Sequence, residues 1–182
     1  MDITETVYAA DRTEWRAWLS QNHAAAKEIW LVSYARSTNR PSVSYLHAVE
    51  EALCFGWIDG IAKKMDTERT AQRFTPRRPK GNWTELNKER ARRLIAAGLM
   101  TDAGRAVLPD LTLRPLEIAP DILEALQADP QTWENFQSFP DLYQRIRIGV
   151  IEEQRRNPAV FLQRLNSLLQ KTAQNKMFRI LE

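Results

Sequence analysis

The sequence predicts an α+β fold, with a small and mainly antiparallel sheet, helices packed on it, and a C-terminal helical extension. In the first part of the chain, short runs rich in β-branched and aromatic residues alternate with helical patterns. Two of these runs, 57–65 and 69–75, have the spacing of a hairpin, and after Pro120 every pattern is helical. We therefore expect an α+β domain over residues 1–114 and a helical extension over 115–182, packed on that domain.

Composition excludes several classes of protein. No apolar run approaches the roughly 20 residues that cross a bilayer, so we expect no membrane insertion. The N-terminus lacks the basic and apolar regions of a secretory signal, which favours a cytoplasmic location. Cys54 is the single cysteine, which excludes an internal disulfide and a multi-cysteine zinc site.

The N-terminal part predicts a strand, a helix and a second strand. Residues 3–9 fit a short edge strand, and Asp11 and Glu14 have the spacing of a capping box for the helix that follows. Residues 28–34 are rich in β-branched and aromatic side chains and predict a buried strand.

The next helix begins after Ser44, a good capping residue. Leu46, Val49 and Leu53 form its apolar stripe, and Gly56 ends it. The hairpin comes directly after this glycine.

Two prolines follow the second strand of that hairpin. A central strand does not tolerate Pro76 and Pro79, so we expect residues 75–81 to form a loop. Asn82 or Thr84 then caps a helix that Gly98 ends.

The C-terminal half predicts only helices. Thr101 opens a short helix, and the stretch from Pro109 to Pro115 is the expected internal linker. Asn157 and Pro158 form a cap and first helical position. The expected later helices cover residues 121–128, 131–137, 140–156 and a segment from 158 onward.

Positive charge is concentrated in one stretch. The chain carries a net charge of +3, but Lys63 to Arg105 contain twelve basic and five acidic residues, a net +7. The remainder therefore carries −4. Such a segregation favours an anionic partner, here nucleic acid or another polyanion.

The residues best suited to catalysis or metal binding make poor sites. His47 and Cys54 lie on one helical stripe, but seven residues at 1.5 Å rise place them about 10 Å apart, too far for a nucleophile and its base. His47 and Glu51 supply only two metal ligands, so we predict no metal. The Walker and dinucleotide glycine patterns are missing, and we predict no cofactor.

Asp59 lies in an apolar stretch and needs a partner, for which we predict Arg73 across the hairpin. One interpretation is a structural ion pair. The other is a general acid or base.

The best candidate site is the loop before the helix at Trp83. Arg77, Arg78 and Lys80 supply positive charge beside a helix N-terminus, which favours anions. In an alternative interpretation, Arg77 and Arg78 tie the loop to Glu152 or Glu153. The full predicted anion or ligand site, with two tryptophans as a stacking surface, is Trp57, Asp59, Arg73, Arg77, Arg78, Lys80, Asn82 and Trp83.

Four motifs carry a family resemblance. They are ALCFGWIDG from Ala52, QRFTPRRPKGNW from Gln72, NKERARRLIAAG from Asn87 and MTDAG from Met100. In this order and spacing they resemble the YdeI/OmpD-associated, bacteriocin-protection (OmdA-type) family, strongly over about residues 43–105 and more loosely before and after. The resemblance implies kinship with the YjbR/CyaY-like group of small α+β proteins.

These features predict a non-enzymatic binding protein of the bacterial cytoplasm. Its basic face would take nucleic acid or another polyanion, and the resemblance implies a link to stress or bacteriocin protection. The alternative is an enzyme on a small anionic substrate, with Asp59 as acid or base and Arg77 and Arg78 as the anion clamp. The sequence predicts neither the specific ligand nor the oligomeric state.

Overall fold

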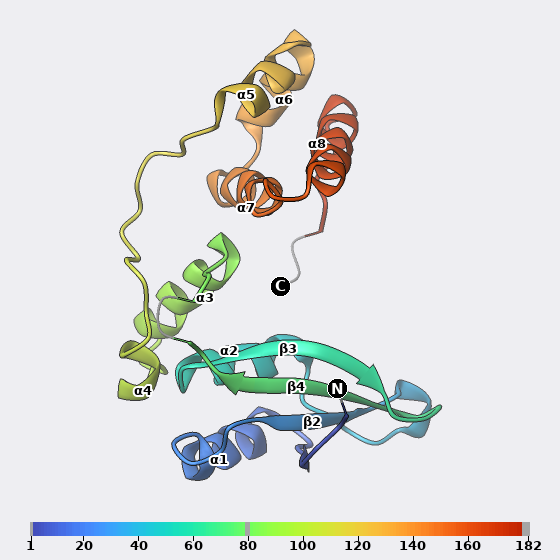
Figure 1. Ribbon diagram of the computed structural model, residues 1–182, viewed down its shortest axis with the longest axis vertical. Helices are drawn as coiled ribbons and strands as arrows, with labels where there is room; N and C mark the ends of the chain where they lie inside the picture. Colours follow the sequence, from blue (N-terminus) through green and yellow to red (C-terminus); the bar gives the residue numbers. More distant parts are fainter. Residues whose placement is uncertain (1, 79–80, 180–182) are drawn as a thin grey trace. The chain divides into compact units, whose positions relative to one another are not determined.

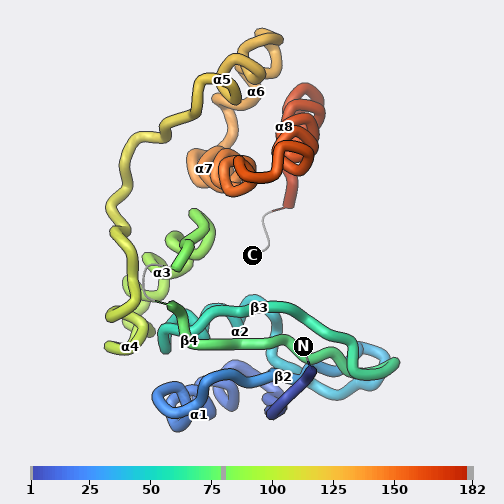
Figure 2. The backbone as a smooth tube through the Cα atoms, in the orientation of Figure 1, coloured from blue at the N-terminus to red at the C-terminus, as the bar shows by residue number. Residues whose placement is uncertain are grey.

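The computed structural model describes residues 2–78 and 81–179, and it has the predicted α+β class (Figure 1). Internal contacts divide the chain into two compact units. The first contains Met1–Asn82 and Lys88–Leu111, and the second contains Trp83–Asn87 and Thr112–Glu182. Residues 108–119, between the last helix of the first unit and the next helix, contain no helix or strand (Figure 2). The packing of the helical extension on the α+β domain stays a prediction.

The first unit contains a four-stranded sheet in the order β1-β2-β4-β3. All of the expected strands form, but the sheet is mixed, because β1 pairs parallel to β2 while the other two pairings are antiparallel. The parallel pairing follows from the helix between β1 and β2, which returns the chain to the same end of the sheet. The strands are β1 Thr6–Tyr8, β2 Ile29–Tyr34, β3 Trp57–Lys64 and β4 Arg69–Pro76.

The expected hairpin is confirmed in β3 and β4, where Lys64 pairs with Thr70. A carboxylate closes its turn, since Asp66 Oδ1 accepts hydrogen bonds from the backbone N–H groups of Glu68 at 2.9 Å and Arg69 at 2.8 Å. An Asp at this position is common because its side chain replaces a backbone acceptor.

Our prediction of a loop from Thr75 was wrong, because β4 continues to Pro76. The pairing of β4 with β2 ends where Phe74 lies opposite Ile29, so beyond Phe74 only β3 pairs with β4. Pro76 lies opposite Trp57 of β3, where its missing N–H leaves no β2 partner unsatisfied. The loop therefore begins at Arg77.

Predicted caps begin the helices of the first unit. Asp11 accepts from the N–H groups of Thr13 and Glu14, and Ser44 accepts from that of His47. Each satisfies donors that a helix start leaves open. These helices are α1 Arg12–Asn22, the short 3-10 helix η1 Arg36–Thr38, α2 Tyr45–Cys54 and α4 Asp102–Arg105, together with α3 Glu85–Ala96 from Lys88 onward.

Helices α1 and α2 bury the sheet face that carries Trp57 and Phe74. The rings of Trp15 and Phe74 lie 5.2 Å apart, and Trp57 Nε1 donates to the carbonyl of His23 at 3.2 Å. Trp15, Trp57 and Phe74 are fully buried and form the centre of this core. The aromatic side chains that the sequence concentrates here thus stabilise the sheet rather than line a ligand site.

The second unit is helical, as predicted. Asn157 caps its last helix, with Pro158 at the first helical position. No helix in the described part of the chain is long and apolar enough to cross a membrane. Its helices are α5 Pro120–Gln127, α6 Pro130–Ser138, α7 Asp141–Glu152 and α8 Pro158–Ala173. Its buried apolar core comprises Ile122, Leu126, Phe136, Phe139, Tyr143, Ile148, Ile151, Phe161, Leu165 and Leu168.

Candidate functional site

Asp59 is bound by a tyrosine and not by the predicted arginine. The hydroxyl of Tyr45, the first residue of α2, donates to Asp59 Oδ2 at 2.6 Å. Arg73 instead donates through Nε to Glu28 at 2.8 Å. The strand register explains the error, because Asp59 lies opposite Phe74, and Arg73 projects from the other face of the sheet.

The hydrogen bond to Asp59 keeps Tyr45 protonated. Partial burial, together with the bond to the Asp59 carboxylate, raises the pKa of Tyr45 to about 12. Because the neutral phenol is the form that donates to a carboxylate, both causes favour it. The pair therefore holds the start of α2 against β3.

Arg77 lies on the inside of the loop. Its backbone N–H donates to Gly56 O at 2.9 Å, and its Nη1 donates to Asn82 O at 3.2 Å. The side chain is 7% exposed, and this burial lowers the pKa of Arg77 to about 10, against the opposing effect of Asp59. The Arg77 guanidinium therefore binds a backbone carbonyl of the same segment, and it is too buried to act as an open anion clamp.

Arg78 points outward and lines a hollow of about 510 Å³. The end of β4 and the segment after α1 form this hollow, which brings Arg78 together with Arg73 and Lys27. We call it the basic hollow; its remaining lining residues are Ala24, Ala25, Ala26, Thr75 and Pro76.

The three cations of the basic hollow differ in their partners. Arg73 forms an ion pair with Glu28, so its charge is largely compensated. Lys27 and Arg78 are exposed and form no ion pair within residues 2–78 and 81–179. No described residue that lines the hollow carries a carboxylate. Two uncompensated positive charges on one concave surface attract anions.

Of the other predicted site residues, Trp57, Asn82 and Trp83 do not line the basic hollow. Trp57 is buried in the core, so its ring is not available to stack on a ligand. Asn82 is exposed and contributes its carbonyl to Arg77, while Trp83 is half-buried. Lys80 lies outside the described residues. Thr84, and not Asn82, caps α3, since its hydroxyl accepts from the N–H of Asn87 at 3.1 Å.

The polar stripe on α2 is structural. Glu51 is 1% exposed and pairs with Arg12 and Arg16 at 2.5 Å each. Cys54 is buried, and burial together with Glu51 raises the pKa of its thiol to about 11, which disfavours the nucleophilic thiolate. The described residues contain no group of three or more side chains suited to a metal ion.

Lys27 and Tyr45 are the site residues that our sequence reasoning missed. Lys27 stands alone in a weakly patterned segment after α1, and only the fold places it beside Arg78. Tyr45 has a signal in the sequence, because it directly follows the capping residue Ser44 and is therefore the first residue of α2, the helix that precedes β3. An aspartate early in β3 then lies within reach of a hydroxyl at that helix start.

The fold and the hollow define a class: an α+β protein with a basic surface hollow, joined to a helical unit. Residues 7–107, more than half of the chain, match the family described as "Domain of unknown function (DUF8412)", and the chain belongs to this family. Residues 115–175 match the family described as "Bacteriocin-protection, YdeI or OmpD-Associated".

The second match supports the YdeI/OmpD-associated resemblance, but it lies in the helical unit. The motifs on which we based that resemblance lie instead within the first match. Comparisons with curated proteins and with solved structures found no significant match. The relation to the YjbR/CyaY-like group stays a prediction.

Proposed function

We propose that this bacteriocin-protection-type protein is a non-enzymatic binding protein that holds a polyanion, such as nucleic acid, at the basic hollow. The observation that carries the proposal is the pair of exposed cations, Lys27 and Arg78, in a hollow whose described lining residues include no carboxylate. Phosphate groups bind such cations without sequence preference, and each contact releases counterions from the nucleic acid.

Arg73 has a supporting role in this proposal. Its bond to Glu28 fixes the guanidinium at the wall of the hollow, and Glu28 also accepts a hydrogen bond from Thr4 at 2.5 Å. An arginine held in place loses less side-chain freedom when a phosphate approaches. Its compensated charge makes it a positioning contact rather than the main source of attraction.

Binding should depend on Lys27 and Arg78 and should weaken as salt rises. For duplex DNA the log–log slope of affinity against salt is about −0.9 for each phosphate contact. The double variant Lys27→Ala/Arg78→Ala should therefore flatten the slope by about 1.8. Fluorescence anisotropy with labelled duplex DNA at several salt concentrations measures this slope, and unlabelled RNA and polyphosphate serve as competitors.

A matched control separates the effect of the basic hollow on binding from the effect of the protein's net charge. Arg36→Ala/Lys64→Ala removes the same charge from two exposed side chains of the first unit that do not line the basic hollow. This control should leave the slope unchanged. Equal loss in both double variants, or no binding by the wild type to any of the three polyanions, would refute the proposal.

A further inference from the structure

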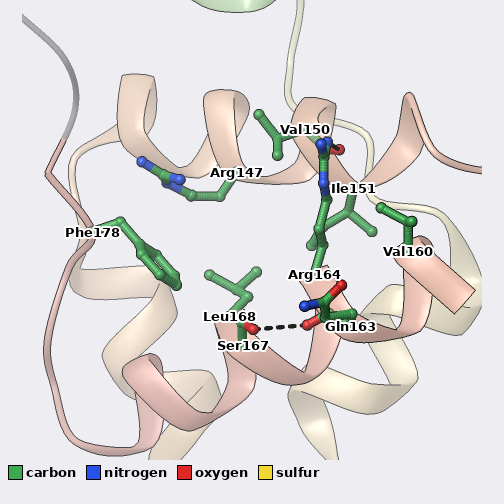
Figure 3. A pocket seen from close by; sticks show the side chains of 9 residues that line it. All are labelled: Arg147, Val150, Ile151, Val160, Gln163, Arg164, Ser167, Leu168 and Phe178. Atoms are coloured by element: carbon green, nitrogen blue, oxygen red, sulfur yellow. Dashed lines mark hydrogen bonds between the residues drawn. The ribbon is translucent and has the colours of Figure 1, made fainter. Parts of the chain in front are cut away.

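The helical unit contains a second hollow, of about 360 Å³, formed by α7, α8 and the segment after α8 (Figure 3). This volume is at the lower end of the roughly 300–1,000 Å³ typical of small-molecule sites. All of its lining residues lie between Arg147 and Phe178, within the second unit. It is therefore separate from the basic hollow of the first unit.

One part of this second hollow is apolar. Ile151 and Leu168 are buried core residues that reach its surface, and Val150 and Phe178 line it beside them. Figure 3 shows Phe178 on one side of the hollow and Ile151 with Val150 on the other. An apolar chain or ring placed between these side chains would be removed from water, which is favourable in proportion to the area buried.

The first cation of this hollow is Arg147 on α7. Its guanidinium lies 4.8 Å from the ring centre of Phe178 and 5.3 Å from that of Tyr143, and its Nη2 donates to Arg179 O at 3.2 Å. Burial lowers the pKa of Arg147. The aromatic rings thus hold a partly desolvated cation in one orientation beside the apolar surface.

The second cation is Arg164 on α8. Its Nη1 donates to Val150 O near the end of α7 at 2.7 Å, which fixes the guanidinium and leaves further N–H groups for a ligand. Neither Arg147 nor Arg164 pairs with a carboxylate in the part of the chain that the structure describes, and no acidic side chain lines the hollow. Two partly buried cations without a counter-ion favour an anion.

We propose that this second hollow binds a small organic carboxylate that carries an apolar chain or ring. The carboxylate accepts hydrogen bonds from Arg164 and supplies one negative charge that partly compensates the charges of Arg147 and Arg164, while the apolar part lies against Leu168 and Phe178. A purely inorganic anion would leave the apolar surface exposed to water. A neutral apolar molecule would leave the cations without a counter-ion, so both halves of the ligand are needed.

Titration calorimetry of the full chain with octanoate tests the proposal, with acetate and octanol as probes that each lack one half of the ligand. Octanoate should bind at least about tenfold more tightly than either. Arg147→Met and Arg164→Met retain an apolar stem but remove the charge, and each should weaken octanoate binding about tenfold. The control Arg156→Met removes an exposed arginine of the same unit that does not line the hollow, and it should bind as the wild type does.

A pocket-filling variant distinguishes loss of the ligand site from loss of folding. Ser167→Trp places a large ring in the hollow while it keeps both arginines, and it should abolish octanoate binding with an unchanged circular dichroism spectrum. The proposal is overturned if the wild type does not bind octanoate, if octanol or acetate binds equally well, or if Arg156→Met loses as much affinity as Arg164→Met. Octanoate binding that persists in Ser167→Trp would also overturn it.

Discussion

Gly104 permits a close approach between α4 and α2, and its replacement by alanine should destabilise the first unit. A Cβ atom at this position would lie 2.3 Å from the carbonyl oxygen of Cys54 and 2.5 Å from the sulfur of Met100. The same Cys54 oxygen accepts hydrogen bonds from the N–H of Thr101 at 3.2 Å and from its hydroxyl. The added methyl group therefore clashes with the backbone atom that fixes α4 to α2.

The magnitude follows from two opposing effects. Overpacking typically costs about 1–3 kcal/mol, and we expect the upper end because the oxygen of Cys54 belongs to the backbone and cannot rotate away. Alanine recovers up to about 1 kcal/mol of helix propensity relative to glycine. The free energy of unfolding should therefore fall by about 2 kcal/mol, which corresponds to about 4–8 °C in the melting temperature for a chain of this size.

Urea denaturation followed by tryptophan fluorescence measures this loss, because Trp15 and Trp57 lie in the core of the same unit. Gly149→Ala is the matched control, since its Cβ would make only an ordinary contact at 3.6 Å in the middle of α7. That variant should be at least as stable as the wild type. A Gly104→Ala protein with the wild-type midpoint would refute the steric argument.

Two further predictions concern titratable groups of the first unit. The Cys54 thiol is buried, and its pKa is raised to about 11. At pH 8 it should react with iodoacetamide at least about a hundredfold more slowly in the native protein than in the urea-unfolded protein. Equal rates would contradict its burial. The pKa of Tyr45 is raised from about 10 in the unfolded chain to about 12. Its contribution to stability is therefore complete below pH 10 and is lost as the pH rises towards 12. The difference in melting temperature between the wild type and Tyr45→Phe should shrink over this range, and a constant difference would contradict the assignment.

The sequence was sufficient to predict the elements because their signals are local. Capping residues such as Asp11 and Ser44 bind N–H groups within three residues, so their effect does not depend on the rest of the fold. The hairpin turn at Asp66 is equally local. The parallel pairing of β1 was not predicted, although a helix between the two strands is compatible with it, because no local pattern shows that β1 and β2 are neighbours in the sheet.

The candidate site was harder to predict because it depends on which way each side chain points. Arg73 lies near Asp59 in the hairpin, but the register places the two on opposite faces of the sheet. Lys27 lies about fifty residues before Arg78 and reaches it only because α1 returns the chain beside the end of β4. Neither relation follows from spacing along the chain.

The adjacent residues Arg77 and Arg78 show why the net charge counted from the sequence overestimates the exposed, unpaired charge that is accessible to a partner. Arg77 is buried and bound to the carbonyl of Asn82, whereas Arg78 is exposed in the basic hollow. Elsewhere in the +7 stretch, Arg69 is bound by Asp66, and Glu89 binds two further arginines. At about −0.9 per phosphate contact, Arg77, Arg78 and Lys80 together would give a salt slope of about −2.7, whereas the proposed contacts Lys27 and Arg78 would give about −1.8. A measured contribution near −1.8 that disappears with these two side chains would separate local concave charge from the net charge of the segment.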